Sequence, residues 1–221
     1  CPLPVVVKAD GLASGKGVLV CGTRQEAIAA GRAMVEERRF GGAGSAVVVE
    51  EFMDGEEASV LALVDGETVV VLPPLQDHKR RFAGDRGPNT GGMGAYTPVP
   101  ALTEALLEQV RREVLLPAAR GLIADGTPYR GLLYAGIMLT PTGPRVVEFN
   151  CRFGDPECEP LVLALESDLL ALLDATARGR LRDADPVQVH PGAVCCVVLV
   201  DEGYPDAVRP GRPLGVLPPD Q

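Results

Sequence analysis

The chain has 221 residues and a formal net charge of −9, with 46% hydrophobic and 23% charged residues. This length can bury a substantial core and suffices for one large or two small domains. Its acidic balance, its 4% of aromatic residues and its lack of tryptophan argue against nucleic-acid binding, which needs clustered cations and stacking surfaces. No apolar run approaches the ~20 residues of a membrane span. We therefore expect no nucleic-acid partner and no membrane partner.

The cysteines and histidines give no metal-binding or disulfide pattern. No pair of cysteines has C-x-x-C spacing, and the chain contains only two histidines. This usage predicts reduced thiols in the cytoplasm rather than a disulfide framework or a zinc site. The cysteines are at positions 1, 21, 151, 158, 195 and 196.

A glycine-rich turn lies between two apolar runs in VVVKADGLASGKGVLV, residues 5–20. It is not a Walker loop, because Lys16 is followed by Gly17 instead of serine or threonine, and three residues after Gly17 stands Val20 where a dinucleotide fingerprint needs glycine. The run after the turn is β-branched, whereas both of those loops lead into a helix. We expect residues 5–10 and 17–21 to pair as a hairpin, whose turn is either a lid over phosphates or a plain surface turn.

A helix and two strands follow the hairpin. Residues 23–37 predict a helix that opens with a capping box between Thr23 and Glu26. In EEFMDGEE, residues 50–57, Glu50 ends one strand and Glu57 begins the next. Backbone groups at such a crossing can hydrogen-bond to an adenine, and a carboxylate nearby can accept hydrogen bonds from both ribose hydroxyls. Solvated charges at two strand ends also fit this segment.

Residues 72–96 are polar and show no helical or strand periodicity. Asp77 and Lys79 lie in one charged run, and Asn89 precedes a second glycine cluster. A loop of this length is either functional or disordered. The flanking strands and the scarcity of serine and glutamate favour an ordered, functional loop.

A helix and a second hairpin are predicted next. Residues 103–124 have apolar side chains at helical spacing, with Pro117 as the expected kink. Residues 129–150 predict two strands joined by the turn PTGP. The chain is therefore of the α+β class.

The last strand of this hairpin ends in two oxygen-bearing side chains. Glu148 and Asn150 share one face by the period-two geometry of a strand, while Val147 and Phe149 face the core. Two oxygen ligands on one face suit Mg²⁺. An ordinary half-exposed strand end has the same pattern.

A charged turn, CRFGDPECEP, follows at residues 151–160 and leads into a helix predicted for 158–178. A linker rich in charge and proline comes next, and AVCCVVLV begins a new strand, so we expect a domain boundary near residue 180. The chain begins at Cys1, without methionine and directly before a strand. We expect it to be part of a longer polypeptide.

Taken in order, these segments resemble a known family. The segments EEFMDGEE, QDHKR, GPNTGGMGAY, GLLYAGIML and EFNCRFGDPE resemble the phosphoribosylamine–glycine ligases, the glycinamide ribonucleotide synthetases of the ATP-grasp superfamily. The resemblance covers nearly the whole chain. QDHKR and PNTGGMG are its most specific parts.

The resemblance implies an ATP-grasp fold of two α+β lobes that clamp ATP. It assigns residues 1–55 to the small lobe with the lid, residues 56–180 to the large lobe with the metal and substrate site, and residues 181–221 to the start of a C-terminal domain. The implied activity joins glycine to 5-phosphoribosylamine through a glycyl phosphate and yields glycinamide ribonucleotide, ADP and phosphate. The implied cofactors are ATP and Mg²⁺ or Mn²⁺. The parent would be about twice as long, a monomer or fused to other purine-pathway domains, and this fragment alone is expected to be inactive.

The resemblance also assigns roles to residues of this chain. Glu148 and Asn150 match the metal ligands. Arg152 and Asp155 match residues beside the metal that orient phosphate and glycine, and Asp77, Lys79 and Asn89 match the substrate side. The residues that match ATP contacts are Lys8, Ser14, Gly15, Lys16, Gly17, Glu50, Glu51, Phe52, Met53 and Glu57.

One position departs from the superfamily pattern, and two alternatives stay open. Many ATP-grasp relatives have an aspartate where this chain has Gly136, which leaves a third carboxylate for a second metal in doubt. A different ATP-grasp carboxylate–amine ligase, or a nucleotide-binding module without turnover, would keep the same ATP residues. A nucleotide-binding module would bind ATP but show no glycine-dependent release of ADP.

Overall fold

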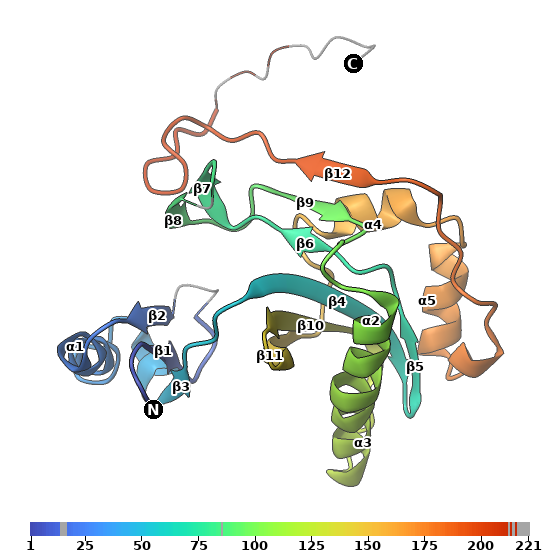
Figure 1. Ribbon diagram of the computed structural model, residues 1–221, viewed down its shortest axis with the longest axis horizontal. Coiled ribbons are helices and arrows are strands. Elements are labelled where there is room, and N and C mark those ends of the chain that lie inside the picture. Colours follow the sequence, from blue (N-terminus) through green and yellow to red (C-terminus); the bar gives the residue numbers. More distant parts are fainter. Residues whose placement is uncertain (14–16, 85, 212, 214, 216–221) are drawn as a thin grey trace. The chain divides into compact units, whose positions relative to one another are not determined.

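The computed structural model describes residues 1–13, 17–84, 86–211, 213 and 215. The chain divides into two compact units, unit 1 (Cys1–Gly55) and unit 2 (Glu56–Gln221). Figure 1 colours them along the sequence, from blue to red. Ser14, Gly15 and Lys16 of the predicted lid lie outside the described residues. Each unit is taken by itself below.

Unit 1 is an antiparallel sheet packed against one helix. Its elements are β1 (Val5–Ala9), β2 (Val18–Cys21), α1 (Arg24–Val35), a 3-10 turn (Gly41–Gly44) and β3 (Val47–Glu51). The sheet order β2-β1-β3 confirms the predicted hairpin. The capping box is also confirmed, because Glu26 N donates to Thr23 Oγ1 at 3.2 Å and Thr23 N donates to Glu26 Oε2 at 3.2 Å. The small core forms where alternate valines of β1 pack on Met34 of α1.

Gly17 has a packing role at the start of β2. The residue is buried, and a Cβ there would lie 2.8 Å from the Cβ of Ala13 and 3.0 Å from that of Ala9. Real side chains do not approach so closely, so a valine at this position would overpack the hairpin. The glycine is therefore required by the fold of unit 1, whatever it also contributes to a lid.

Unit 2 is built on a four-stranded antiparallel sheet with the order β11-β10-β4-β5. Smaller sheets of order β12-β9-β6 and β7-β8 accompany it. Its strands are β4 (Glu56–Asp65), β5 (Thr68–Val71), β6 (Gln76–Asp77), β7 (Arg80–Phe82), β8 (Arg86–Asn89), β9 (Gly94–Thr97), β10 (Arg130–Thr140), β11 (Gly143–Asn150) and β12 (Val194–Val197). Its helices are α2 (Glu104–Val110), a π-helical turn (Arg111–Leu115), α3 (Leu116–Ala124), α4 (Cys158–Ala164), α5 (Leu169–Ala177) and a 3-10 turn (Leu181–Asp183).

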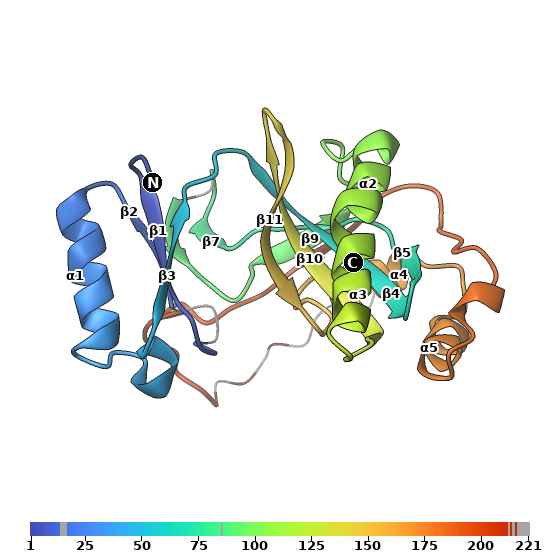
Figure 2. The same ribbon diagram turned by 90° about the horizontal axis from the view of Figure 1, so that it is seen from below.

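Helices cover both faces of the four-stranded sheet in unit 2. Alternate side chains of β4 point to opposite faces, so Val60 and Ala62 pack with α2 and α3, while Leu61 and Leu63 pack with α4 and α5. Figures 1 and 2 show these two helical layers from directions 90° apart. Burial on both faces explains why β4 is almost continuously apolar.

The long segment at 72–96 is ordered through short strands rather than one loop. β6 and β9 pair with each other, and β7 pairs with β8. The sequence gives no clear period here because β6 and β7 are two and three residues long. For the described residues of this segment, which leave out residue 85, the expectation of an ordered structure is confirmed.

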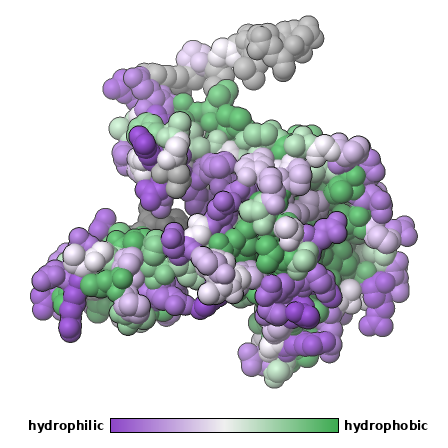
Figure 3. Space-filling model, in the orientation of Figure 1, coloured by the Kyte–Doolittle hydropathy of each residue, from purple (hydrophilic) through white to green (hydrophobic). Residues whose placement is uncertain are grey.

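The helix predicted for 103–124 is interrupted, though at a different place from the expected kink. The π-helical turn at Arg111–Leu115 lies directly before α3, whose second residue is Pro117. Proline is tolerated in a first turn because its missing N–H needs no partner there. The outer surface of α2 and α3 is largely hydrophilic (Figure 3).

The helix predicted for 158–178 is wrong in its middle, because α4 and α5 are separate helices. Leu165 is extended and bridges to Val189, and Asp168 starts α5 by accepting from Ala171 N at 3.0 Å. Beyond residue 180, β12 pairs with β9, and the described residues there group with unit 2. That these residues begin a further domain stays a prediction.

Candidate active site

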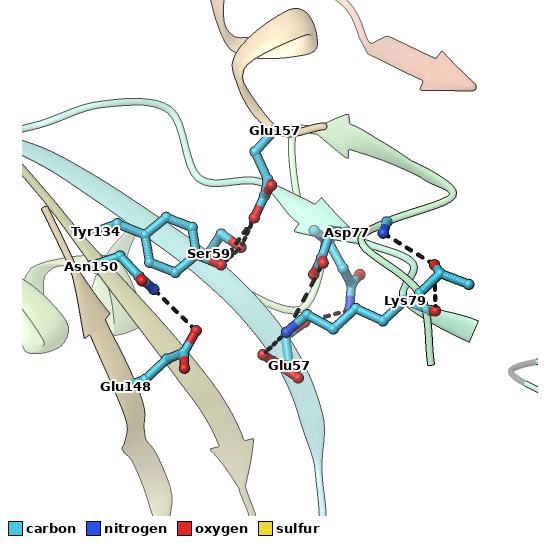
Figure 4. A network of polar contacts seen from close by, with 11 residues as sticks. Glu57, Ser59, Asp77, Lys79, Tyr134, Glu148, Asn150 and Glu157 are labelled. Atoms are coloured by element: carbon cyan, nitrogen blue, oxygen red, sulfur yellow. Dashed lines mark hydrogen bonds and ion pairs between the residues drawn. The ribbon is translucent and has the colours of Figure 1, made fainter. Parts of the chain in front are cut away.

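One face of the unit 2 sheet changes from apolar to polar along its strands. Gly136 of β10 lies opposite Ser59 of β4 and Glu148 of β11, and Tyr134 lies opposite Asn150. Residues directly opposite in neighbouring strands point to the same face, so these polar side chains project together (Figure 4). The other end of the face is filled by the leucines that pack against α4 and α5.

The predicted metal ligands lie side by side at this polar end. Asn150 Nδ2 donates to Glu148 Oε1 at 3.0 Å. A Cβ on Gly136 would lie in ordinary van der Waals contact with Glu148, 3.4 Å from its Cγ. Phe149 faces the side of α2 and α3, since it pairs with Ala135. The prediction that Phe149 is in the core is wrong, because the side chain is 45% exposed on an edge strand.

A second charged cluster joins the start of β4 to the end of β6. Lys79 Nζ lies 2.5 Å from Glu57 Oε1 and 4.0 Å from Asp77 Oδ2. The segment is anchored to β4 because Gln76 Nε2 donates to the Glu57 carbonyl at 2.9 Å. The structure thus brings Glu57, which is expected to contact ATP, together with Asp77 and Lys79, which are expected on the substrate side (Figure 4).

The charges in this cluster shift one another's ionisation. Burial raises the pKa of Asp77 from 3.8 to about 6, Lys79 acts against that rise, and the carboxylates of Glu157 and Glu57 add to it. Burial acts against the charged form of Lys79, but the negative charges of Asp77 and Glu57 outweigh it and raise the pKa of the lysine. Lys79 therefore stays charged, and the pKa of Asp77 lies at about 6.

The raised pKa of Asp77 predicts a pH-dependent stability. Its side chain is 6% exposed, and its contribution to stability is complete below about pH 3.8 and is lost as the pH rises through about 6. We expect Asp77→Asn to raise the free energy of unfolding by about 3 kcal/mol at pH 8 and hardly at all at pH 4, since one pKa unit corresponds to about 1.4 kcal/mol. Urea unfolding of both proteins across this range measures the difference. The exposed Asp125→Asn is the control, and an equal, pH-independent effect of the two changes would contradict the prediction.

A buried glutamate bonds to two hydroxyls on the same face. Glu157 Oε1 accepts from Ser59 Oγ at 2.9 Å and from Tyr134 OH at 2.9 Å, and the two hydroxyl oxygens are 2.7 Å apart. The three residues are between 1% and 5% exposed. Burial, and then the charge of Glu157, raise the pKa of Tyr134. This cluster attaches the start of α4 to β4 and β10.

The turn between β11 and α4 is held by close packing as well. A Cβ on Gly154 would lie 2.3 Å from Glu157 Oε2, and one on Gly92 would lie 2.3 Å from Pro156 Cδ. The turn therefore rests on the buried glutamate on one side and on the glycine-rich segment before β9 on the other. Arg152 and Asp155 are exposed on it, and Arg152 Nη1 donates to the Phe153 carbonyl at 2.8 Å.

Unit 1 carries the remaining predicted ATP contacts. Lys8 Nζ lies 2.6 Å from Glu50 Oε2, across the β1–β3 pair. Glu51 ends β3, and Phe52 is 41% exposed just beyond it. Met53 is half-buried in the segment that follows.

Sequence reasoning missed part of the cluster in unit 2. Ser59 and Tyr134 lie in apolar strand runs, where nothing in the sequence marks them, and Glu157 was visible only as one charge in a charged turn. Asn89, by contrast, is exposed at the end of β8. Within the described part of the chain, no hydrogen bond uses the Asn89 side chain, so its assignment to the substrate side stays a prediction.

The donor chemistry of β11 fits a magnesium ion that is shared with phosphates. Among the described residues no group of three or more histidine, cysteine or acidic side chains could hold a metal by itself. Mg²⁺ commonly takes only one or two carboxylates from the protein and completes its shell with waters and substrate phosphates. The adjacent Glu148 and Asn150 meet that requirement.

Comparison with known proteins gives the family. The sequence model described as phosphoribosylglycinamide synthetase, ATP-grasp (A) domain, matches residues 1–158. The chain belongs to this family. A phosphoribosylamine–glycine ligase from Caulobacter vibrioides is 55% identical over 208 residues, which are 94% of this chain and 48% of the relative. The human trifunctional purine biosynthetic protein adenosine-3 is 48% identical over 217 residues, which are 98% of this chain and 22% of the relative.

A solved structure supports the same family and fold. The phosphoribosylamine–glycine ligase of Thermotoga maritima superposes with a TM-score of 0.82 at 38% identity, over 94% of this chain and 52% of that one. The α+β ATP-grasp fold is thereby confirmed. The chain spans about half the length of the curated bacterial ligases of this family that it matches. Within the described residues, no helix combines the length and the apolar character needed to cross a bilayer.

Proposed function

We propose that this chain is the ATP-binding part of a cytoplasmic phosphoribosylamine–glycine ligase. The observation that carries the proposal is the polar end of the unit 2 sheet, where Glu57, Lys79, Glu148 and Asn150 meet, in a chain 55% identical to a ligase of that name. The substrates are ATP, glycine and 5-phosphoribosylamine. The products are glycinamide ribonucleotide, ADP and phosphate.

The chemistry has two steps. A glycine carboxylate oxygen attacks the γ-phosphorus of ATP, the bond to the bridging oxygen breaks, and ADP leaves. The amine of 5-phosphoribosylamine then attacks the carbonyl carbon of the glycyl phosphate, loses a proton and displaces phosphate. A carboxylate needs this activation because its own oxygen is a poor leaving group, and most of the catalysis is positioning and charge stabilisation.

Individual residues are proposed to contact ATP or its metal. Lys8 is proposed to contact ATP phosphates, with residues 14–17 as the lid, and the backbone of residues 50–53 to contact adenine. Glu57 is proposed to accept hydrogen bonds from the ribose hydroxyls. Its Oε1 atom would then have to give up or share the hydrogen bond that Lys79 donates to it. Glu148 and Asn150 would hold Mg²⁺ or Mn²⁺, which would withdraw charge from the phosphate oxygens during transfer.

Residues beside the metal site are proposed to orient the second substrate. Arg152 and Asp155 stand on a turn fixed by Glu157, so their backbone needs little reorganisation when phosphate and glycine bind. Asp77 and Lys79 are proposed to form the adjoining wall, in which the charged Lys79 is paired with Glu57. In this proposal these groups bind and orient the substrates, and they keep water away from the labile acyl phosphate.

A hybrid protein tests the proposal directly. In this hybrid ligase, the chain replaces the matched segment of the Caulobacter relative. We expect release of ADP that depends on both glycine and 5-phosphoribosylamine, at a rate within about tenfold of the unmodified relative. A folded hybrid that binds ATP but shows no glycine-dependent release would refute the proposal and favour a nucleotide-binding module.

A further inference from the structure

A small cavity lies beside the β7–β8 hairpin of unit 2. Its volume is about 220 Å³, below the 300–1,000 Å³ typical of sites for drug-sized ligands, so it suits a compact group. Basic and small side chains dominate its wall. The lining residues are His78, Arg80, Arg81, Phe82, Ala83, Gly84 and Met93.

None of the described carboxylates neutralises the arginines of this cavity. In the part of the chain that the structure describes, no carboxylate lies within 4 Å of either Arg80 or Arg81, whereas Lys79 beside them is paired with Glu57. Elsewhere in unit 2, Arg111, Arg130 and Arg178 all have acidic partners. Two adjacent arginines with no described carboxylate close by present a local site for an anion.

Backbone carbonyls hold both arginines without cancelling their charge. Arg80 Nη1 donates to the Gly87 carbonyl at 2.8 Å, and Arg81 Nη2 donates to the Glu202 carbonyl at 2.9 Å. A guanidinium has five N–H donors, so each arginine keeps further donors for a ligand. The ring of His78 is stacked on Tyr96, with centroids 5.7 Å apart, which limits its movement.

The chemistry of these groups selects a phosphate. Arginine forks bind phosphate oxygens through paired, charge-assisted hydrogen bonds. The positive charge of Lys79 is not sufficient to bind a phosphate alone, because the carboxylates of Glu57 and Asp77 already lie beside it. A carboxylate has one negative charge and would neutralise one arginine. A dianionic phosphate monoester has two negative charges and would neutralise both.

We propose that the cavity beside the β7–β8 hairpin binds the phosphate of the sugar-phosphate substrate, with Arg80 and Arg81 as its main ligands. This inference rests on the proposed function and assigns a substrate group to residues which that function left unused. Because the hairpin directly follows Lys79, the phosphate would be held close to the wall formed by Asp77 and Lys79. The site would select an amine that carries a phosphate over one that does not.

Ligand titration of the 221-residue chain tests this assignment with ribose 5-phosphate, inorganic phosphate and Mg·ATP as separate probes. We expect ribose 5-phosphate to bind more tightly than inorganic phosphate and without competing with Mg·ATP. Arg80→Gln and Arg81→Gln should each lower the affinity for ribose 5-phosphate about 10- to 100-fold, which is the range for a lost hydrogen bond to a charged group. Both variants should bind Mg·ATP as the parent chain does, which also shows that they fold.

The control is Arg86→Gln, which removes the same charge from the same hairpin at a residue that does not line the cavity. Arg86→Gln should lower the affinity for ribose 5-phosphate less than about threefold, as expected when a distant charge screened by salt is removed. Equal losses in all three variants, tighter binding of inorganic phosphate, competition with Mg·ATP, or no binding of ribose 5-phosphate would each overturn the assignment. If the unsubstituted chain did not bind Mg·ATP, that result would instead count against the proposed function.

Discussion

Glu148→Gln is expected to lower the rate of ADP release by the hybrid ligase about 100-fold or more. The change keeps the volume of the side chain and removes one charged oxygen ligand, and a bound metal supplies several kcal/mol of charge stabilisation to phosphoryl transfer. Raising Mg²⁺ or substituting Mn²⁺ should restore part of the rate. In the 221-residue chain, the same change should weaken binding of Mg·ATP more than binding of ATP without metal.

Two comparisons separate this role from a purely structural one. Glu148 is an exposed residue at a strand end, so its replacement should change the free energy of unfolding by at most about 1 kcal/mol without nucleotide. Glu67→Gln removes an exposed carboxylate at the far end of the same sheet and should leave the rate unchanged. An unaltered rate and an unaltered Mg²⁺ dependence in Glu148→Gln would remove Glu148 from the metal site.

Glu157→Ala should destabilise unit 2 by about 2–4 kcal/mol. The substitution leaves a void and takes away the acceptor of two buried hydroxyls, and both effects are costly in a close-packed interior. Glu157→Gln keeps a carbonyl oxygen that can accept from Ser59 and Tyr134, so it should cost less than half as much. Urea unfolding of the three proteins measures these differences.

Glu159→Ala serves as the matched control for this prediction. Glu159 is exposed in the first turn of α4, two residues from Glu157, so its loss should cost less than about 0.5 kcal/mol. A double-mutant cycle with Ser59→Ala should give a coupling energy of about 0.5–3 kcal/mol, as found for residues in one hydrogen-bond network. Additive effects, or equal losses in Glu157→Ala and Glu159→Ala, would show that the buried cluster does not hold the turn.

Local sequence was sufficient for the elements whose pattern is complete within one segment. The capping box at Thr23 and the hairpin of β10 and β11 follow from neighbouring residues alone. The side-by-side position of Glu148 and Asn150 also follows, because the period of a strand is a local property. Where a second segment competes, local reasoning fails, as at Leu165, which leaves the helix to bridge to Val189.

The family, the order of the main elements and the candidate ATP and metal residues could be predicted from the sequence, because the motifs that indicate them are contiguous segments with their own spacing. The folded chain was needed to show that Lys79 pairs with Glu57, 22 residues away, and that Ser59 and Tyr134 bond to Glu157 across separations of 98 and 23 residues. Those contacts depend on strand register and on which helix covers which face of the sheet. Register is a property of the whole unit, so no single segment of the sequence could specify it.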